Sequence, residues 1–431
     1  MRLLPILFVF CLLSAGCVTV PGPGPRGWAV AEGGGLDPDA PSGKSLFAWS
    51  IERAREAFPG SPISAVVIGA IPLTDDQERP ERDRRLDAFL DAGADTAVGL
   101  VIDETTAGEP WTADAIRGSH VVFIRGGDQS RYVRWWRGTP IEDAIREVHA
   151  RGGVVIGTSA GAAVLGGWSF DAMVGSLDPV ESLTDSTPRR LTLTRDFLGF
   201  APGVLFDTHF TERARLPRMA LMLASLPPAD RATTLAVGLD PRTAFAVGPG
   251  GEGLVLGEGT VTLLRWTADS ACDLKPGGPP TIRGLAFDQL TPGTRADRGG
   301  RVTSRPAEPR GTAHAWAGPG VLDRGWFASV EPAWSGRGGR EEQTASLIAS
   351  VASGPAHAGA WIPEGASLSD EGPSRVRVSS GSTRSAVVID ARRAVRRWTI
   401  EPAPRRDAPR AHIEGATLHI LGPGVAFPDG P

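Results

Sequence analysis

Lysine, tyrosine and cysteine are all scarce in this chain of 431 residues. Only Lys44 and Lys275 and a single tyrosine occur, so nearly all of the positive charge is arginine. The 45 basic residues are slightly outnumbered by 49 acidic ones, which excludes a polybasic nucleic-acid binder as the first interpretation. No histidine pair at helical spacing and no cysteine cluster is present to bind a metal ion. We therefore expect neither a metal nor another cofactor.

The N-terminal segment has the pattern of an export signal. Leu3 to Leu13 is an apolar run that is too short to span a bilayer, and Arg2 supplies a positive charge before it. The run ends in the letters LSAGC, which resemble the lipobox of bacterial lipoproteins. We therefore expect a signal peptide over residues 1–16 and lipidation of Cys17, with an ordinary signal peptide as the alternative.

The lipobox implies an exported protein that is anchored by lipid to the bacterial membrane, in the periplasm or at the cell surface. In bacterial lipoproteins, an aspartate directly after the lipidated cysteine is associated with retention in the inner membrane. Val18 occupies that position here, so we expect the protein in the outer membrane. Cys11 leaves with the signal peptide, so Cys272 stays alone and no intrachain disulfide is available. Residues 17–26, which are rich in proline and glycine, are predicted to form the lipidated end and an extended tether.

Residues 27–266 alternate short apolar strands with helical patterns. Unbroken apolar runs such as Ala65–Gly69 are typical of strands that are buried on both faces. Thr139, Pro140 and Glu142 form a capping box that predicts the start of a helix. The pattern predicts an α/β fold with a parallel sheet and helices on both faces. In such sheets the functional sites form at the carboxyl ends of strands.

The rest of the chain has a different character. The 55 glycines and 37 prolines make the whole chain rich in loops, although 41% hydrophobic residues argue for a folded protein. Residues 267–310 are rich in proline, glycine and arginine and are predicted to be a linker. Residues 311–431 contain short β-like runs and are predicted to be a small β-rich accessory region.

The first candidate for chemistry is a serine on a glycine-flanked turn. Residues 157–161 read GTSAG, the form G-x-S-x-G, and they follow a buried strand. Such a turn exposes the hydroxyl of Ser159 above the sheet edge and directs the amide of Ala160 at a developing oxyanion. A phosphate loop is the alternative, but the lysine that a Walker loop requires is absent.

A serine nucleophile needs a base, and His209 is the candidate among the seven histidines. It follows the apolar pair Val204 and Leu205 and the carboxylate Asp207, so it is expected at the end of a strand, as Ser159 is. The other six histidines lie in contexts that are typical of surface positions.

Four ordered motifs resemble the cyanophycinase-like branch of the dipeptidase E (S51) family of serine peptidases. They are GGDQ at 126–129, GTSAGA at 157–162, DTHF at 207–210 and GLDPRTA at 238–244. The likeness runs roughly from Trp28 to Trp266. It implies a fold like that of class I glutamine amidotransferases, which is flavodoxin-like, and so agrees with the predicted parallel sheet.

The resemblance implies a role for each matching residue. Ser159 is the nucleophile, His209 is the general base, and the amides of Gly127 and Ala160 form the oxyanion hole. The substrate is contacted by Gln129, Asp207, Arg213, Arg215 and Arg218.

The third catalytic member in the cyanophycinases is a glutamate between the serine and the histidine. Glu181 matches that stretch best, and Asp171, Asp178 and Asp185 compete with it.

Two departures leave the substrate open. Thr208 stands where cyanophycinases usually have glutamine, and Pro217 stands where glycine is common. The three arginines after His209 favour a site for substrate carboxylates, because a guanidinium binds a carboxylate through two hydrogen bonds. The alternative for them is the solvated first turn of a helix.

We therefore expect a serine-type exopeptidase that hydrolyses small peptides or β-aspartyl-linked, cyanophycin-like substrates through an acyl-enzyme. The partners are then a peptide or a β-aspartyl polymer and, through the lipid anchor, the membrane; a homodimer is left open. The alternative is an inactive relative that binds peptides or a partner protein. A conventional α/β-hydrolase esterase shares the G-x-S-x-G motif, but the GGDQ and DTHF motifs disfavour it.

Overall fold

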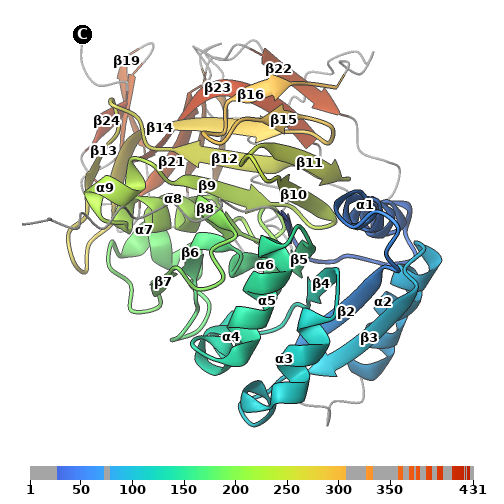
Figure 1. Ribbon diagram of the computed structural model, residues 1–431. Coiled ribbons are helices and arrows are strands. Elements are labelled where there is room, and N and C mark those ends of the chain that lie inside the picture. The colour runs from blue at the N-terminus through green and yellow to red at the C-terminus, as the bar shows by residue number, and fades with distance from the viewer. Residues whose placement is uncertain are drawn as a thin grey trace, which may run out of the picture.

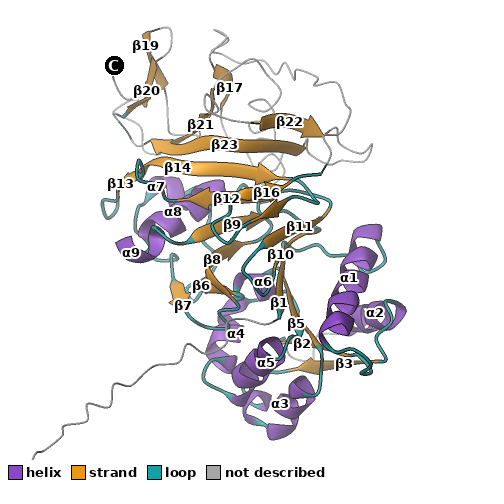
Figure 2. Ribbon diagram, turned by 45° about the horizontal axis from the view of Figure 1, so that its top comes forward, coloured by secondary structure: helices purple, strands orange, loops and turns teal. Residues whose placement is uncertain are grey.

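The computed structural model describes residues 27–71 and 78–306, and beyond them the strands found between residues 327 and 427 with short adjoining stretches (Figures 1 and 2). The predicted signal peptide, the tether and Cys17 lie outside the described residues. In the part that is described, no helix is both long enough and apolar enough to cross a membrane.

The first of two large sheets is built on five parallel strands. Their order across the sheet is β1 (Trp28–Glu32), β5 (Val154–Thr158), β4 (Val121–Ile124), β2 (Ser64–Gly69) and β3 (Thr96–Val101). Antiparallel strands extend the sheet beyond β1, namely β10 (Thr243–Val247), β11 (Gly253–Gly257), β15 (Arg295–Ala296) and β16 (Val302–Ser304).

Helices cover both faces of the parallel strands because both faces are apolar. Val30 of β1 packs in one hydrophobic cluster with Phe47 of α1, whereas its neighbours Ala29 and Ala31 pack in another cluster with Ile145 of α5. The predicted parallel sheet with helices on both faces is confirmed (Figure 2). The helical segments along this sheet are α1 (Pro41–Ala57), α2 (Glu78–Asp91), the 3₁₀ turn η1 (Thr106–Gly108), α3 (Pro110–Arg117), α4 (Gln129–Trp136) and α5 (Pro140–Ala150).

The second large sheet lies beside the first and begins with three parallel strands. These are β6 (Gly166–Phe170), β8 (Ala201–Asp207) and β9 (Leu235–Leu239), with β7 (Leu193–Arg195) at the edge. Beyond β9 the order is β12 (Val261–Arg265), β14 (Thr281–Leu290), β23 (Arg410–Leu421), β21 (Ala386–Asp390), β18 (Ala358–Ile362) and β17 (Phe327–Pro332). Two short strands pair at its side, β13 (Ala271–Asp273) with β14 and β22 (Arg396–Ile400) with β23.

Apolar side chains join the second sheet to the first sheet and to its own helices. Phe206 and Val237 share a cluster with Phe245 of the first sheet, whereas Leu205 packs with Met219 on the opposite face. The helices of this half are α6 (Ala160–Ala163), α7 (Glu181–Thr184), α8 (Leu216–Ser225) and α9 (Pro228–Arg231). A small third sheet contains β19 (Leu368–Gly372), β20 (Arg375–Val378) and β24 (Ala426–Phe427).

The structure corrects the predicted linker over 267–310. Its middle forms β14, a strand of 10 residues that pairs with β12 on one side and with β23 on the other. Ile282, Leu285 and Phe287 are fully buried, so this segment belongs to the core. The strands β21 and β23 of the predicted accessory region continue the same sheet (Figure 1).

Candidate active site

Ser159 lies at the turn between β5 and α6, at the carboxyl end of a central strand. Its backbone has a φ of 52° and a ψ of −115°, a strained conformation that is typical of a nucleophile turn. The amide of Ser159 donates to the carbonyl of Glu32 at 2.9 Å, which ties the turn to the end of β1. The hydroxyl of the preceding Thr158 donates to the Glu32 carboxylate, and burial raises the pKa of that carboxyl to about 7.

The glycines of the motif are required by close backbone contacts. A Cβ on Gly157 would lie 2.2 Å from the carbonyl oxygen of Gly161, and a Cβ on Gly161 would lie 2.4 Å from that of Ile124. Both clashes are with backbone, which cannot move aside without displacing a central strand. A Cβ on Gly126 would lie 3.2 Å from the Cβ of Ser159, so the loop after β4 lies directly against the nucleophile turn.

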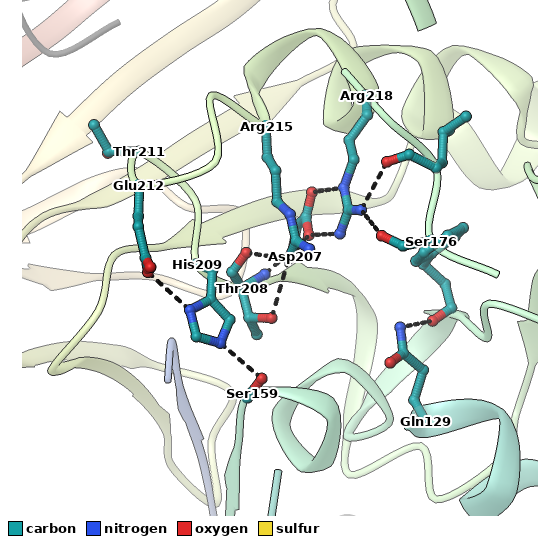
Figure 3. A network of polar contacts seen from close by, with 12 residues as sticks. Gln129, Ser159, Ser176, Asp207, Thr208, His209, Thr211, Glu212, Arg215 and Arg218 are labelled. Atoms are coloured by element: carbon teal, nitrogen blue, oxygen red, sulfur yellow. Dashed lines mark hydrogen bonds and ion pairs between the residues drawn. The ribbon is translucent and has the colours of Figure 1, made fainter. Parts of the chain in front are cut away.

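His209 follows β8 of the second sheet, and its ring lies between Ser159 and Glu212 (Figure 3). The Ser159 Oγ and His209 Nε2 atoms are 2.9 Å apart, and the His209 Nδ1 and Glu212 Oε2 atoms are also 2.9 Å apart. The hydrogen bond to His209 is the main reason that the pKa of Glu212 is lowered from its ordinary value. A charged carboxylate, an imidazole and a hydroxyl in this order match the geometry of a catalytic triad.

Glu181 does not contact His209, so the prediction of Glu181 as the third member is wrong for this structure. It begins α7, and its carboxylate pairs with Arg190 at 3.0 Å. The competing carboxylates Asp171, Asp178 and Asp185 accept hydrogen bonds from other amides or hydroxyls. Sequence reasoning missed Glu212 because it searched between the serine and the histidine. The available signal was an H-x-x-E spacing within the stretch that contains His209.

The glycines directly after β1 contact the candidate base His209. The carbonyl of Gly33 accepts the amide of His209 at 2.7 Å. Gly34 has a φ of 105°, and a Cβ there would lie 2.3 Å from the His209 Nε2 atom. A run of three glycines at 33–35 is the sequence signal for this close approach.

The two predicted oxyanion donors belong to segments that adjoin Ser159. Ala160 follows Ser159 at the first position of α6, and Gly127 belongs to the loop that contacts Ser159. Gly127 has a φ of 137°, which favours glycine. Their roles as donors remain predictions that this placement allows.

Asp207, Arg215 and Arg218 form a buried charged cluster behind His209 (Figure 3). Arg218 donates from one edge of its guanidinium, Nε and Nη2, to both carboxylate oxygens of Asp207, with Nε 2.8 Å from Oδ2. Its Nη1 donates to the Leu177 carbonyl at 3.0 Å. Arg215 lies 3.5 Å from Asp207 and donates to the Thr208 carbonyl. Burial, followed by the neighbouring Arg218, lowers the pKa of Arg215 to about 9.

The remaining predicted substrate contacts lie at the rim of this cluster. Gln129 begins α4, and its side-chain amide donates to the carbonyl of Phe170 at 3.2 Å (Figure 3). Arg213 is exposed, unlike Arg215 and Arg218. The structure therefore separates the three arginines into one solvent-facing cation and two buried ones. In the described part of the chain, no group of three or more potential ligand side chains could hold a metal ion.

A hydroxyl on a strained turn, followed by an imidazole and a carboxylate, is the arrangement of groups that serine hydrolases use. Comparison with known proteins gives the family. The model of peptidase family S51 matches residues 77–228. A cyanophycinase of Nostoc sp. PCC 7120 is 30% identical over 250 residues, which cover 57% of this chain and 79% of that protein. The chain belongs to peptidase family S51, as predicted.

Further relatives are similar over shorter or more divergent stretches. A cyanophycinase of Synechococcus elongatus is 33% identical over 202 residues, which cover 46% of this chain and 58% of that protein. The crystal structure of a peptidase from an acI-B1 Actinobacterium is 19% identical and has a TM-score of 0.47, covering 64% of this chain and 98% of the other.

Proposed function

We propose that this protein is a serine-type exopeptidase that cleaves small acidic peptides or β-aspartyl-linked substrates. The observation that carries the proposal is the continuous chain of contacts from Glu212 through His209 to Ser159, with 2.9 Å at each step. A serine without a base in reach would be a weak nucleophile. Membership of peptidase family S51 supports the same chemistry.

The reaction follows from the order of these groups. With its Nδ1 proton held by Glu212, His209 can accept the Ser159 proton at Nε2 while Oγ attacks the scissile carbonyl carbon. The oxyanion that forms receives hydrogen bonds from the amides of Gly127 and Ala160. His209 then gives its proton to the leaving amine. In the second half of the reaction, water gives a proton to His209 and attacks the acyl-enzyme, and His209 returns the proton to the Ser159 oxygen as it leaves.

The charge behind the site favours a substrate carboxylate. Asp207 neutralises one of the two buried guanidiniums, and the exposed Arg213 adds a further positive charge near the base. Positive charge in a poorly hydrated site attracts anions strongly. The relatives named above are cyanophycinases, which supports a β-aspartyl substrate as the first to test.

Hydrolysis of a substrate panel tests the proposal. Cyanophycin, β-aspartyl dipeptides and α-aspartyl dipeptides are incubated with the wild type and with Ser159→Ala, and the released amines are quantified. We expect cleavage of at least one β-aspartyl substrate, and a loss of roughly 10³-fold or more in kcat in Ser159→Ala. Equal activity of the two proteins would refute the assignment of Ser159 as the nucleophile. A folded wild type without any activity would favour the alternative of an inactive relative that binds peptides or a partner protein.

We further propose that Cys17 anchors the enzyme to the bacterial membrane, with the outer membrane as its destination. The support is the lipobox sequence before Cys17. Expression in a bacterial host fed a radiolabelled fatty acid should label the wild type and leave Cys17→Ala unlabelled. Equal labelling of both, or soluble wild-type protein without lipid, would contradict the anchor.

A further inference from the structure

The single tyrosine of the chain lies next to the candidate oxyanion loop. Tyr132 is a residue of α4, it is fully buried, and its ring packs on Trp136 with the ring centroids 4.5 Å apart. Its hydroxyl points back along the chain and shares its single proton between the carbonyl oxygens of Arg125 at 2.7 Å and of Gly126 at 3.0 Å. The phenol therefore holds two consecutive carbonyls of the loop that follows β4.

The second of these bonds determines the direction of an amide. The carbonyl of Gly126 and the N–H of Gly127 belong to one planar trans peptide, so they point in opposite directions. A hydrogen bond that holds the carbonyl toward Tyr132 therefore holds the N–H on the other side. Gly126 and Gly127 have no side chains to resist rotation of this peptide, since glycine is permissive on both sides of φ. Without the phenol, the peptide would be free to turn over.

The same loop lies against the nucleophile. A Cβ on Gly126 would lie 3.2 Å from the Cβ of Ser159, and a Cβ on Gly161 would lie 2.7 Å from the Arg125 carbonyl oxygen, which Tyr132 also binds. With the Gly127 N–H facing Ser159, as the predicted oxyanion hole requires, a rotation of the Gly126–Gly127 peptide would exchange this donor for a carbonyl oxygen. A carbonyl oxygen there repels a developing oxyanion, where an N–H stabilises it.

We infer that Tyr132 is a positioning residue for the oxyanion hole, which acts by holding the peptide between Gly126 and Gly127 in the orientation that serves Ser159. This inference rests on the proposed serine-peptidase function. It assigns Tyr132 a role in the rate of attack by Ser159, and none in binding the substrate.

The rate at which a fluorophosphonate modifies Ser159 tests the inference without knowledge of the substrate. In this reaction the Ser159 Oγ–P bond forms, the P–F bond breaks, fluoride leaves, and His209 takes the hydroxyl proton. The phosphoryl oxygen occupies the oxyanion hole during the attack. The compared proteins are the wild type, Tyr132→Phe and the control Trp136→Phe, which alters the packing against Tyr132 and leaves its hydroxyl in place.

We expect Tyr132→Phe to be modified about 10- to 100-fold more slowly than the wild type. This effect is smaller than the roughly 10²- to 10³-fold loss caused by removing one oxyanion donor, because the Gly127 amide is still present and only its orientation is released. Trp136→Phe should be modified within about twofold of the wild-type rate. Equal rates for Tyr132→Phe and the wild type, or an equal slowing in both variants, would overturn the inference. A folded wild type that is not modified at all would overturn the proposed function and this inference with it.

A second measurement serves if Tyr132→Phe loses its fold. Because the chain has one tyrosine, fluorotyrosine that is supplied to a tyrosine-requiring host replaces Tyr132 alone. The fluorine resonance should shift when Ser159 is phosphonylated, because the loop that the phenol holds then binds the phosphoryl oxygen. A resonance that is identical before and after complete modification would contradict the coupling.

Discussion

The acid of the candidate triad is the residue that most changes the account of this site. His209 and Glu212 are three residues apart on one turn, and their side chains meet at 2.9 Å. Glu181, which the family resemblance favoured, is engaged with Arg190. A local carboxylate on the same turn therefore occupies the place beside the histidine that the resemblance assigned to a distant one. Its side chain is 39% exposed, so its carboxylate is partly hydrated.

Glu212→Gln should lower kcat by about 100-fold or more, because the amide no longer stabilises the imidazolium that forms during attack. Glu181→Gln is the matched control and should keep at least half of the wild-type kcat. Both variants are assayed on the best substrate of the panel described above. A loss of activity in Glu181→Gln with a normal Glu212→Gln would reverse the assignment.

Gly34→Ala should abolish most activity, because the added methyl would lie 2.3 Å from the His209 Nε2 atom and push the ring away from Ser159. Gly35→Ala is the matched control, since Gly35 also has a positive φ of 70° while the nearest atom to its Cβ would be that of Pro241 at 3.6 Å. Both variants place a side chain at a positive φ, with the greater strain at Gly34, whose φ of 105° lies outside the left-handed region. We expect a fall in kcat of about 100-fold or more in Gly34→Ala alone; comparable losses in both would point to strain instead of contact with the histidine.

Individual elements were predictable where their signals are local. The GTSAG turn follows a buried strand as expected, and Thr139 is the N-cap of α5 as predicted. It accepts the Ile141 amide at 3.3 Å, but Glu142 accepts the amide of Gly138 at 2.7 Å instead of that of Thr139, so the capping box is incomplete. The position of His209 at the end of a strand was also predictable. That this strand belongs to a second sheet was not, because the pairing of β8 with β6 and β9 is set by contacts between distant segments.

The strand β14 was missed for a related reason. Gly277, Gly278, Pro279 and Pro280 precede it and Pro292 and Gly293 follow it, so the surroundings read as loop. The pattern inside it is irregular as well, because its register with β23 shifts twice. Its burial depends on β23, which is more than a hundred residues further along the chain.

Phe287→Ala should destabilise the whole protein by about 3–5 kcal/mol, because it would leave a cavity in the middle of a buried strand. Urea denaturation followed by circular dichroism measures the free energy of unfolding. Lys275→Ala, in the same predicted linker but with a side chain that is 78% exposed, should change it by less than about 0.5 kcal/mol. A negligible effect of Phe287→Ala would restore the linker interpretation.

Across the molecule, the site exists because two sheets meet. The candidate nucleophile Ser159 follows a strand of the first sheet, and the candidate base His209 follows a strand of the second. The end of β1 and the residue after it bind the backbone of both, Glu32 that of Ser159 and Gly33 that of His209. Activity therefore depends on the stability of the interface between the two sheets. Two buried groups near these sheets make the stability depend on pH, in opposite directions.

His149, whose sequence context is typical of a surface position, is instead buried against Phe200, and burial lowers its pKa from 6.5 to about 4. His149 binds a proton at higher pH in the unfolded chain than in the folded chain. The contribution of His149 to the free energy of unfolding is therefore present near pH 7 and is lost as the pH falls toward 4. Glu32, with a pKa raised to about 7, makes a contribution that is present near pH 4.5 and is lost as the pH rises toward 7.

Replacing His149 with phenylalanine should therefore remove the loss of unfolding free energy that His149 causes as the pH falls. The difference in unfolding free energy between the wild type and His149→Phe should fall by roughly 3 kcal/mol between pH 7.5 and pH 4. Urea denaturation at five pH values across this window measures it. A difference that stays constant with pH would show that His149 titrates normally in the folded protein.

The central claim is that Ser159 is a nucleophile that His209 activates. The most direct test is the intact mass, followed by peptide mapping, of the wild type, Ser159→Ala and His209→Ala after treatment with an organophosphonate. The account predicts one adduct per wild-type chain, located on the peptide that contains Ser159, with none in Ser159→Ala and strongly slowed modification in His209→Ala. An unmodified wild type that is folded, or an adduct that persists in Ser159→Ala, would contradict it.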